Sequence, residues 1–128
     1  ARYVPLVVKV APDLNDKEVR DMAEVFNSVN IDGLIATNTT SSRVDVEGLK
    51  HGQEKGGLSG KPVFSQSTKV LRKFRKALNS DIALIAAGGV FYRSDMRAKL
   101  DAGADLVQVY TGLIYQGPGM VKTLLKKE

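Results

Sequence analysis

Short apolar runs alternate along this chain with longer segments in which apolar residues recur at intervals of three or four positions. The short runs are rich in Val, Ile and Leu and end at small, hydroxyl or turn-forming residues. This pattern is typical of strands that are buried in a parallel sheet. We therefore predict strands at residues 5–10, 33–36, 82–87 and 106–110.

The longer segments follow the 3.6-residue period of amphipathic helices. The first predicted helix begins with Asn15 or Asp16 as its N-cap and ends near Asn30. Further helices are predicted over about residues 67–78, 94–101 and 118–127, and Pro118 suits the first turn of the last one. The apolar positions that define the first helix are Val19, Met22, Ala23, Val25, Phe26 and Val29.

The predicted elements form four successive βα units without a domain linker. Such alternation favours an α/β fold with a parallel sheet and right-handed crossovers. At 128 residues the chain has about half the length of a typical eight-unit barrel. We expect one domain over residues 1–128, in the form of half a (β/α)8 TIM barrel. The segment 41–66 is too long to be a simple connection, so we expect it to be functional or mobile.

The amino-acid composition excludes several kinds of functional site. Hydrophobic residues make up 43% of the chain and charged residues 26%, which is typical of a globular domain. The absence of Cys excludes disulfides and thiolate chemistry, and the single histidine, His51, excludes a multi-histidine metal site, so we expect no metal. No apolar stretch is long enough to span a membrane, and the opening residues do not resemble a signal peptide. We expect this chain alone to be soluble.

The chain is basic, with a net charge of +5 and a pI of about 9.5. Much of the excess lies at Lys126-Lys127 and in the second predicted helix, where Lys69, Arg72, Lys73 and Lys76 fall opposite an apolar helix face. A solvated helix face explains this pattern, because no aromatic platform or nucleic-acid module accompanies it. We therefore expect no nucleic-acid partner. A nucleic-acid-binding domain stays open as an alternative, and it predicts salt-sensitive binding of oligonucleotides.

Polar or small residues follow each predicted strand. Lys9 ends the first, Thr37, Asn38 and Thr39 follow the second, and Gly88-Gly89 follows the third. The fourth ends at Tyr110-Thr111, and Gly60 lies in the long segment between the second and third strands. In barrels these carboxyl ends build one shared site, which often holds a phosphate near the last two strands. We predict a phosphate-bearing ligand there.

Five motifs, in this order and spacing, resemble the C-terminal half of class 2 dihydroorotate dehydrogenase. They are V-V-K-V-A-P-D-L, I-D-G-L-I-A-T-N-T-T, G-G-L-S-G-K-P, A-G-G-V and G-A-D-L-V-Q-V-Y-T-G. The resemblance covers essentially the whole chain. It implies an FMN-containing (β/α)8 barrel that oxidises dihydroorotate to orotate in pyrimidine (UMP) biosynthesis and passes the electrons to a quinone.

The resemblance also implies roles for individual residues. Lys9 matches a lysine beside the flavin ring, where a cation favours negative charge on the reduced ring. Asn38 and Thr39 match residues that hold the pyrimidine, and an amide and a hydroxyl suit its carbonyl and N–H groups. The remaining flavin contacts are Thr37 and Gly60, with Gly89, Tyr110 and Thr111 around the phosphate. Without the resemblance, a solvent-facing lysine, a polar turn and a flexible glycine loop explain the same residues.

Two features depart from the family pattern. Ala86 stands where the family more often has glycine, and we expect its methyl group to narrow the site slightly. No catalytic residue is assigned in this chain, because the family's base serine, like its quinone tunnel and membrane-resting helices, is expected upstream. We therefore expect the isolated chain to be inactive. No neighbouring base singles out any of the serines in or beside the long segment, and His51 is interpreted as a surface side chain; the serines are Ser41, Ser42, Ser59, Ser65 and Ser67.

The resemblance places the parent enzyme peripherally on a membrane, either the bacterial inner membrane on its cytoplasmic side or the mitochondrial inner membrane. Four βα units leave two unpaired sheet edges and an apolar inner face, so we expect self-association or pairing with the other half of the barrel. Two alternatives stay open. One is a non-catalytic half-barrel that binds phosphate or flavin, and the other is a class 1 dihydroorotate dehydrogenase that uses fumarate or NAD.

Overall fold

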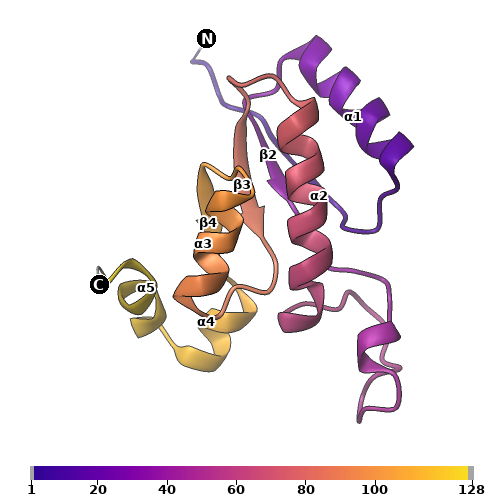
Figure 1. The fold of residues 1–128 in the computed structure, drawn as a ribbon, viewed down its shortest axis with the longest axis vertical. Coiled ribbons are helices and arrows are strands. Elements are labelled where there is room, and N and C mark those ends of the chain that lie inside the picture. Colours follow the sequence, from indigo (N-terminus) through magenta and orange to yellow (C-terminus); the bar gives the residue numbers. More distant parts are fainter. Residues whose placement is uncertain (1, 127–128) are drawn as a thin grey trace.

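The computed structural model describes residues 2–126, which form one parallel sheet with helices along it (Figure 1). The strands are β1 (Val7–Val10), β2 (Gly33–Ala36), β3 (Ala83–Ala87) and β4 (Leu106–Gln108). They are hydrogen-bonded in the order β1-β2-β3-β4, and each neighbouring pair is parallel. The predicted α/β fold with four parallel βα units is thereby confirmed.

The helices between the strands are α1 (Asp16–Val29), α2 (Phe64–Ala77) and α3 (Arg93–Asp101). Asn15 is the N-cap of α1 as predicted: its side chain accepts from Glu18 N at 2.9 Å, while Glu18 Oε2 accepts from Asn15 N at 2.8 Å. This reciprocal pair satisfies two backbone donors that the first turn leaves unpaired. After β4 the chain forms two short helices, α4 (Thr111–Gln116) and α5 (Gly119–Leu125).

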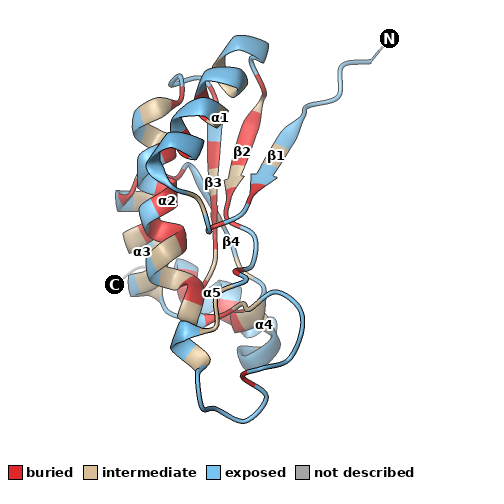
Figure 2. Cartoon of the chain, turned by 90° about the vertical axis from the view of Figure 1, so that its right-hand side faces the viewer, coloured by how far each residue is buried: buried red, intermediate tan, exposed pale blue. Residues whose placement is uncertain are grey.

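The helices cover one face of the sheet, and the other face lies open. Figure 2 shows α1, α2 and α3 on the same side of the strands, where the buried residues gather. Because side chains alternate along a strand, Leu34 and Leu84 enter this layer and are fully buried with Phe74 of α2. On the other face, at the two ends of the sheet, Val7 is 40% exposed and Leu106 is 60% exposed. The sheet therefore has one face that the helices cover and a second, partly apolar face that nothing among the described residues covers.

Several predicted boundaries differ from the observed ones. β1 begins at Val7 instead of residue 5, because Pro5 has no N–H and Leu6 N donates to Asp32 Oδ2 instead of to the sheet. β4 ends at Gln108, two residues early, since the backbone turns at Tyr110 into α4, which we did not predict. The last helix begins after Pro118, and its predicted end at residue 127 lies outside the described residues.

The long segment after β2 is more ordered than predicted. It contains the 3₁₀ turns η1 (Val44–Val46) and η2 (Lys61–Val63), and a bridge pairs Thr40 with Leu58. η2 leads directly into α2, which starts at Phe64, three residues earlier than its apolar period indicates. No helix among residues 2–126 is long and apolar enough to cross a membrane.

Candidate functional site

A cavity of about 490 Å³ opens at the carboxyl ends of the strands. All eight residues that we singled out from the sequence line it: Lys9, Thr37, Asn38, Thr39, Gly60, Gly89, Tyr110 and Thr111. They come from the ends of four strands and from the segment before α2. The structure thus brings together residues that lie up to 102 positions apart in the sequence. Their individual roles stay predictions.

The segment after β2 is fixed by its neighbours on both sides. Thr37 N donates to Ala87 O of β3 at 2.9 Å, and Asn38 N donates to Val10 O of β1 at 2.7 Å. Thr37 is buried, whereas the side chains of Asn38 and Thr39 are exposed at the cavity. Asn38 Oδ1 accepts from Thr39 N at 2.9 Å, which orients the amide. Two polar side chains are therefore presented to a ligand on a firmly held backbone.

Asp13, which lies in the loop after β1, anchors this segment. Its carboxylate accepts hydrogen bonds from Thr40 Oγ1, from Ser41 N at 3.0 Å and from Gln66 Nε2 at 3.2 Å. Desolvation tends to raise the pKa of the Asp13 carboxyl, but these hydrogen bonds outweigh it and hold the pKa below its usual value. Asp13 therefore ties the loop after β1 to both the loop after β2 and α2.

Arg43 organises the long segment around the cavity. Its guanidinium donates to Ser42 O at 3.1 Å and to Glu54 O at 3.0 Å, and it also reaches Gly56 O. These hydrogen bonds join the two ends of the segment, and Gly57 packs against Thr39. The contact is so close that a Cβ atom on Gly57 would lie 1.9 Å from Thr39 Oγ1. Sequence reasoning missed this arginine, because its partners are backbone carbonyls, which leave no pattern in the sequence.

The segment then reaches the end of β4. Thr111 Oγ1 donates to Ser59 Oγ at 2.9 Å. Gly60 has a φ of 80°, and a Cβ atom there would lie 3.1 Å from Thr111 Cγ2. Both the left-handed backbone and the close approach favour glycine at this position. The wall of the cavity is thus continuous from the segment before α2 to the start of α4.

Gly88 and Gly89 form the turn after β3, with φ values of 118° and 73°. A Cβ atom on Gly89 would lie 2.5 Å from Phe64 Cβ and 2.9 Å from Phe64 N, so no side chain fits between this turn and α2. Ala86 lies elsewhere: it is fully buried in the core under the helices and does not line the cavity. Our expectation that its methyl group narrows the site is therefore wrong, because alternation points it to the opposite face of β3.

The open face of the sheet contributes two further polar groups. Lys9 is exposed and lines the cavity from β1, and Gln108 is exposed and lines it from β4. Tyr110 is 77% exposed at the rim. Sequence reasoning did not assign Gln108, although a single amide within an otherwise apolar strand was the signal that could have found it.

The remaining polar candidates lie away from the cavity, with one exception. His51 is exposed in the long segment and pairs with Glu54 at 2.5 Å, outside the residues that line the cavity. Ser59 is the one serine of the five that lines the cavity. Ser67 does have a basic neighbour, since Lys99 Nζ lies 2.6 Å from Ser67 Oγ, but both residues are fully buried. No substrate could reach that pair.

These features define a class of protein: an α/β protein of the TIM-barrel type, with a cavity at the carboxyl ends of its parallel strands. The particular family follows from comparison with known proteins. The chain belongs to the dihydroorotate dehydrogenase family, whose model, described as "Dihydroorotate dehydrogenase", matches residues 1–127.

The curated relatives confirm the resemblance to the quinone-dependent class. Proteins named "Dihydroorotate dehydrogenase (quinone)" from Paraburkholderia phymatum and Vibrio parahaemolyticus are each 52% identical to this chain, over 120 and 125 residues. The matches cover 94% and 98% of this chain but 35% and 37% of those proteins. The chain thus spans about a third of the length of the relatives it matches.

Solved structures show the same relationship. The crystal structure of DHODH from Eimeria tenella in complex with ferulenol matches with a TM-score of 0.89 at 42% identity, covering 94% of this chain and 32% of that one. The ligand-free form from the same organism matches with a TM-score of 0.86 at 44% identity, covering 93% of this chain and 33% of that one. These neighbours are TIM barrels, which agrees with the four parallel βα units found here.

Proposed function

We propose that this chain forms the C-terminal part of an FMN-dependent dihydroorotate dehydrogenase that oxidises dihydroorotate to orotate with a quinone as acceptor, in de novo pyrimidine biosynthesis. The observation that carries the proposal is the cavity, because all eight residues singled out by motif line it together. The names of the relatives support the substrate and the quinone acceptor. The peripheral membrane location of the parent enzyme is part of the same proposal.

The residues of the cavity suit a flavin mononucleotide. Its volume of about 490 Å³ falls within the range of small-molecule and cofactor sites. Gly60 and Gly89 offer backbone without side chains at positions where a Cβ atom would be in tight contact with Thr111 and would collide with Phe64, respectively. With Tyr110 and Thr111 they would hold the phosphate, to which the Thr111 hydroxyl would turn the hydrogen that it now donates to Ser59. Thr37 and Lys9 would contact the ring system. When bound, the flavin would accept the hydride, and the Lys9 ammonium would favour the resulting negative charge.

Asn38 and Thr39 would bind the pyrimidine. Their side chains are exposed at the cavity, next to the position proposed for the ring system. An amide offers a donor and an acceptor in one plane, and this matches the paired N–H and C=O groups of orotate. The hydrogen bond from Thr39 N to Asn38 Oδ1 fixes the amide orientation in advance, which lowers the entropic cost of binding.

We assign no catalytic base among the described residues. Ser59 lines the cavity, but its Oγ accepts from Thr111 and no described base contacts it. Proton removal from dihydroorotate is therefore proposed to depend on the part of the enzyme that this chain does not match. A steady-state assay of orotate formation with the purified chain tests this, and appreciable turnover would contradict it.

The first experiment is a titration of the purified chain with FMN, followed by flavin fluorescence, with riboflavin as the comparison that lacks a phosphate. We expect saturable binding of FMN and much weaker binding of riboflavin. Equal binding of several unrelated phosphate esters would favour the alternative of a non-catalytic phosphate-binding half-barrel. Absence of any flavin binding would refute the proposal that this chain by itself forms the flavin site.

A further inference from the structure

Lys99 is a charged residue in the interior of the protein. It projects from α3 towards the first turn of α2 and is fully buried. Its ammonium donates to Ser67 Oγ at 2.6 Å and to Phe64 O at 3.4 Å, and it lies 4.7 Å from the centre of the Phe64 ring. None of the proposed binding roles uses it, and it does not line the cavity.

Burying an ammonium group costs free energy, so its presence in the interior calls for a physical reason. An apolar side chain of similar length would fill the same space between α2 and α3 without loss of hydration. Burial lowers the pKa of Lys99 to about 8, an effect that the charge of Asp95 partly opposes. What an apolar residue could not supply is a set of donors for the two oxygen atoms in the first turn of α2.

These contacts continue to the cavity wall. An ammonium can only donate, so Ser67 Oγ accepts from Lys99, and its own hydrogen can point to Phe64 O at 3.1 Å or to Gly88 O at 3.4 Å. The turn at Gly88-Gly89 packs directly on the same two residues: a Cβ atom on Gly88 would lie 2.7 Å from Ser67 Oγ, and one on Gly89 would lie 2.5 Å from Phe64 Cβ. Lys99 is thus two hydrogen bonds away from the backbone of the cavity.

We propose that Lys99 is a positioning residue for the anion-binding end of the cavity: it holds Phe64 and Ser67 in place, and through them it sets the Gly88-Gly89 turn that receives a phosphate ester. The inference rests on the proposed function, since the ligand is the phosphate of FMN. Lys99 itself does not touch the ligand. The distance between Ser67 Oγ and Lys99 Nζ is that of a catalytic nucleophile and its base. The pair cannot act in this way, because both side chains are buried and do not line the cavity.

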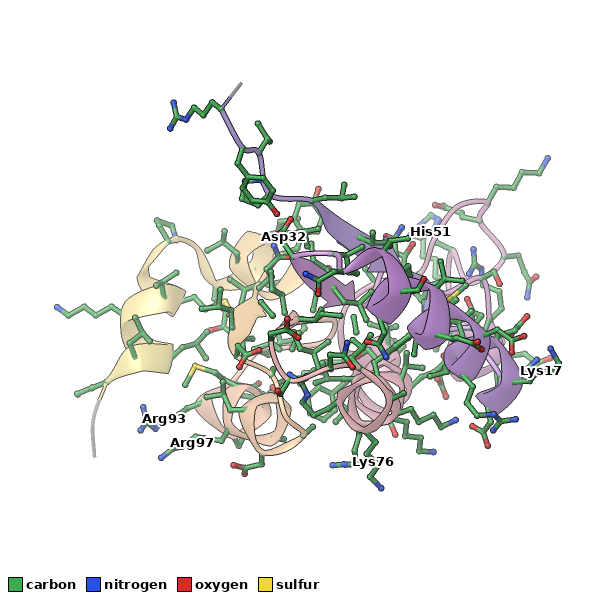
Figure 3. All side chains as sticks on the ribbon, turned by 90° about the horizontal axis from the view of Figure 1, so that it is seen from above. Lys17, Asp32, His51, Lys76, Arg93 and Arg97 are labelled. Carbon is green, nitrogen blue, oxygen red and sulfur yellow. The ribbon has the colours of Figure 1, made fainter. Side chains whose placement is uncertain are left out.

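The test compares Lys99→Met, which keeps the length and removes the donors, with Ser67→Ala and with the double variant. Lys76→Met is the matched control. Lys76 is exposed on α2, at the outer side of the helix layer (Figure 3), so the same chemical change there leaves the Ser67 contacts intact. Ser67→Ala changes the smaller partner and carries the same predictions if Lys99→Met fails to fold.

The first measurement needs no ligand. In amide NMR spectra of the full chain, Lys99→Met and Ser67→Ala should shift the Gly88 and Gly89 resonances and leave Gly117, a remote glycine, unchanged. The double variant should shift the Gly88 and Gly89 resonances little more than either single variant does, because both substitutions act through one chain of contacts. Unchanged Gly88 and Gly89 resonances would overturn the inference, whatever the chain binds.

The second measurement is the dissociation constant for FMN and for riboflavin. We expect Lys99→Met to weaken FMN binding about tenfold, as expected for the loss of a charged hydrogen bond that orders the site, while riboflavin binding stays the same. Equal weakening of both flavins would show a purely structural role and overturn the inference. If the unchanged chain binds no FMN, the proposal that this chain by itself forms the flavin site fails, and the NMR comparison still decides the role of Lys99.

Discussion

The stability of the chain should rise with pH through the titration of Lys99. Burial lowers the pKa of this ammonium from 10.5 to about 8 in the folded chain. Between these two values the unfolded chain binds more protons than the folded one, so folding becomes more favourable as the pH rises. The difference between the two pKa values corresponds to about 3 kcal/mol in the free energy of unfolding. About 2 kcal/mol of this change occurs between pH 7 and pH 10.

Urea denaturation of the wild-type chain and of Lys99→Met at pH 7, 8.5 and 10 measures this effect. Other groups titrate in both proteins, so the informative quantity is the difference between their free energies of unfolding. We expect this difference to move in favour of the wild type by about 2 kcal/mol across the range. A difference for Lys99→Met that does not change with pH would mean that Lys99 is hydrated in solution, and the reasoning from burial would be refuted.

Three further predictions concern the site and the sheet edges. Gly89→Ala should lose about 3 kcal/mol of stability, because its φ of 73° disfavours alanine and the added Cβ atom would collide with Phe64. Gly117 has the same φ, with a ψ of −179° that is essentially restricted to glycine, but no atom lies near its Cβ position, so Gly117→Ala should lose about 2 kcal/mol in thermal or urea unfolding. Asp13→Asn should be less stable than the wild type at neutral pH, because the ionised Asp13 carboxylate accepts the hydrogen bonds that lower its pKa. The difference in the free energy of unfolding should shrink as the pH falls below 3.8 and the carboxylate becomes protonated. Light scattering at high protein concentration should find self-association through the open sheet, and a monodisperse monomer would contradict this.

Local patterns predicted most of the fold. Each strand was found within two residues at either end, because a short Val- and Ile-rich run with a defined stop has few alternatives. α1 was predicted with Asn15 or Asp16 as its cap, and the structure selects Asn15, because Asn15 and Glu18 satisfy each other within one turn. The convergence of Lys9, Thr37, Gly89 and Thr111 followed from topology alone, because parallel strands carry their carboxyl ends to one edge of the sheet.

The missed features depend on contacts between distant segments or lie in segments too short to show a periodic pattern. The first turn of α2 is polar in sequence, and it is held by Lys99, 35 residues further along the chain. α4 is a six-residue helix whose sequence contains two exposed apolar residues, Ile114 and Tyr115, so it shows no amphipathic period. Arg43 orders the long segment through carbonyl groups, which every residue has and which therefore leave no mark on the sequence.

The two ends of the proposed flavin site differ in how completely this chain forms them. At the phosphate end, Gly89 is packed on Phe64 and the Thr111 hydroxyl is already hydrogen-bonded to Ser59. At the ring end, Lys9 is exposed on the uncovered face of the sheet, where water screens its charge. A partner layer over that face, whether a second copy or the remaining strands of a barrel, would desolvate Lys9 and strengthen its effect on the ring. The phosphate should therefore dominate flavin binding by this chain alone, and the contribution of Lys9 should grow once the open face is covered.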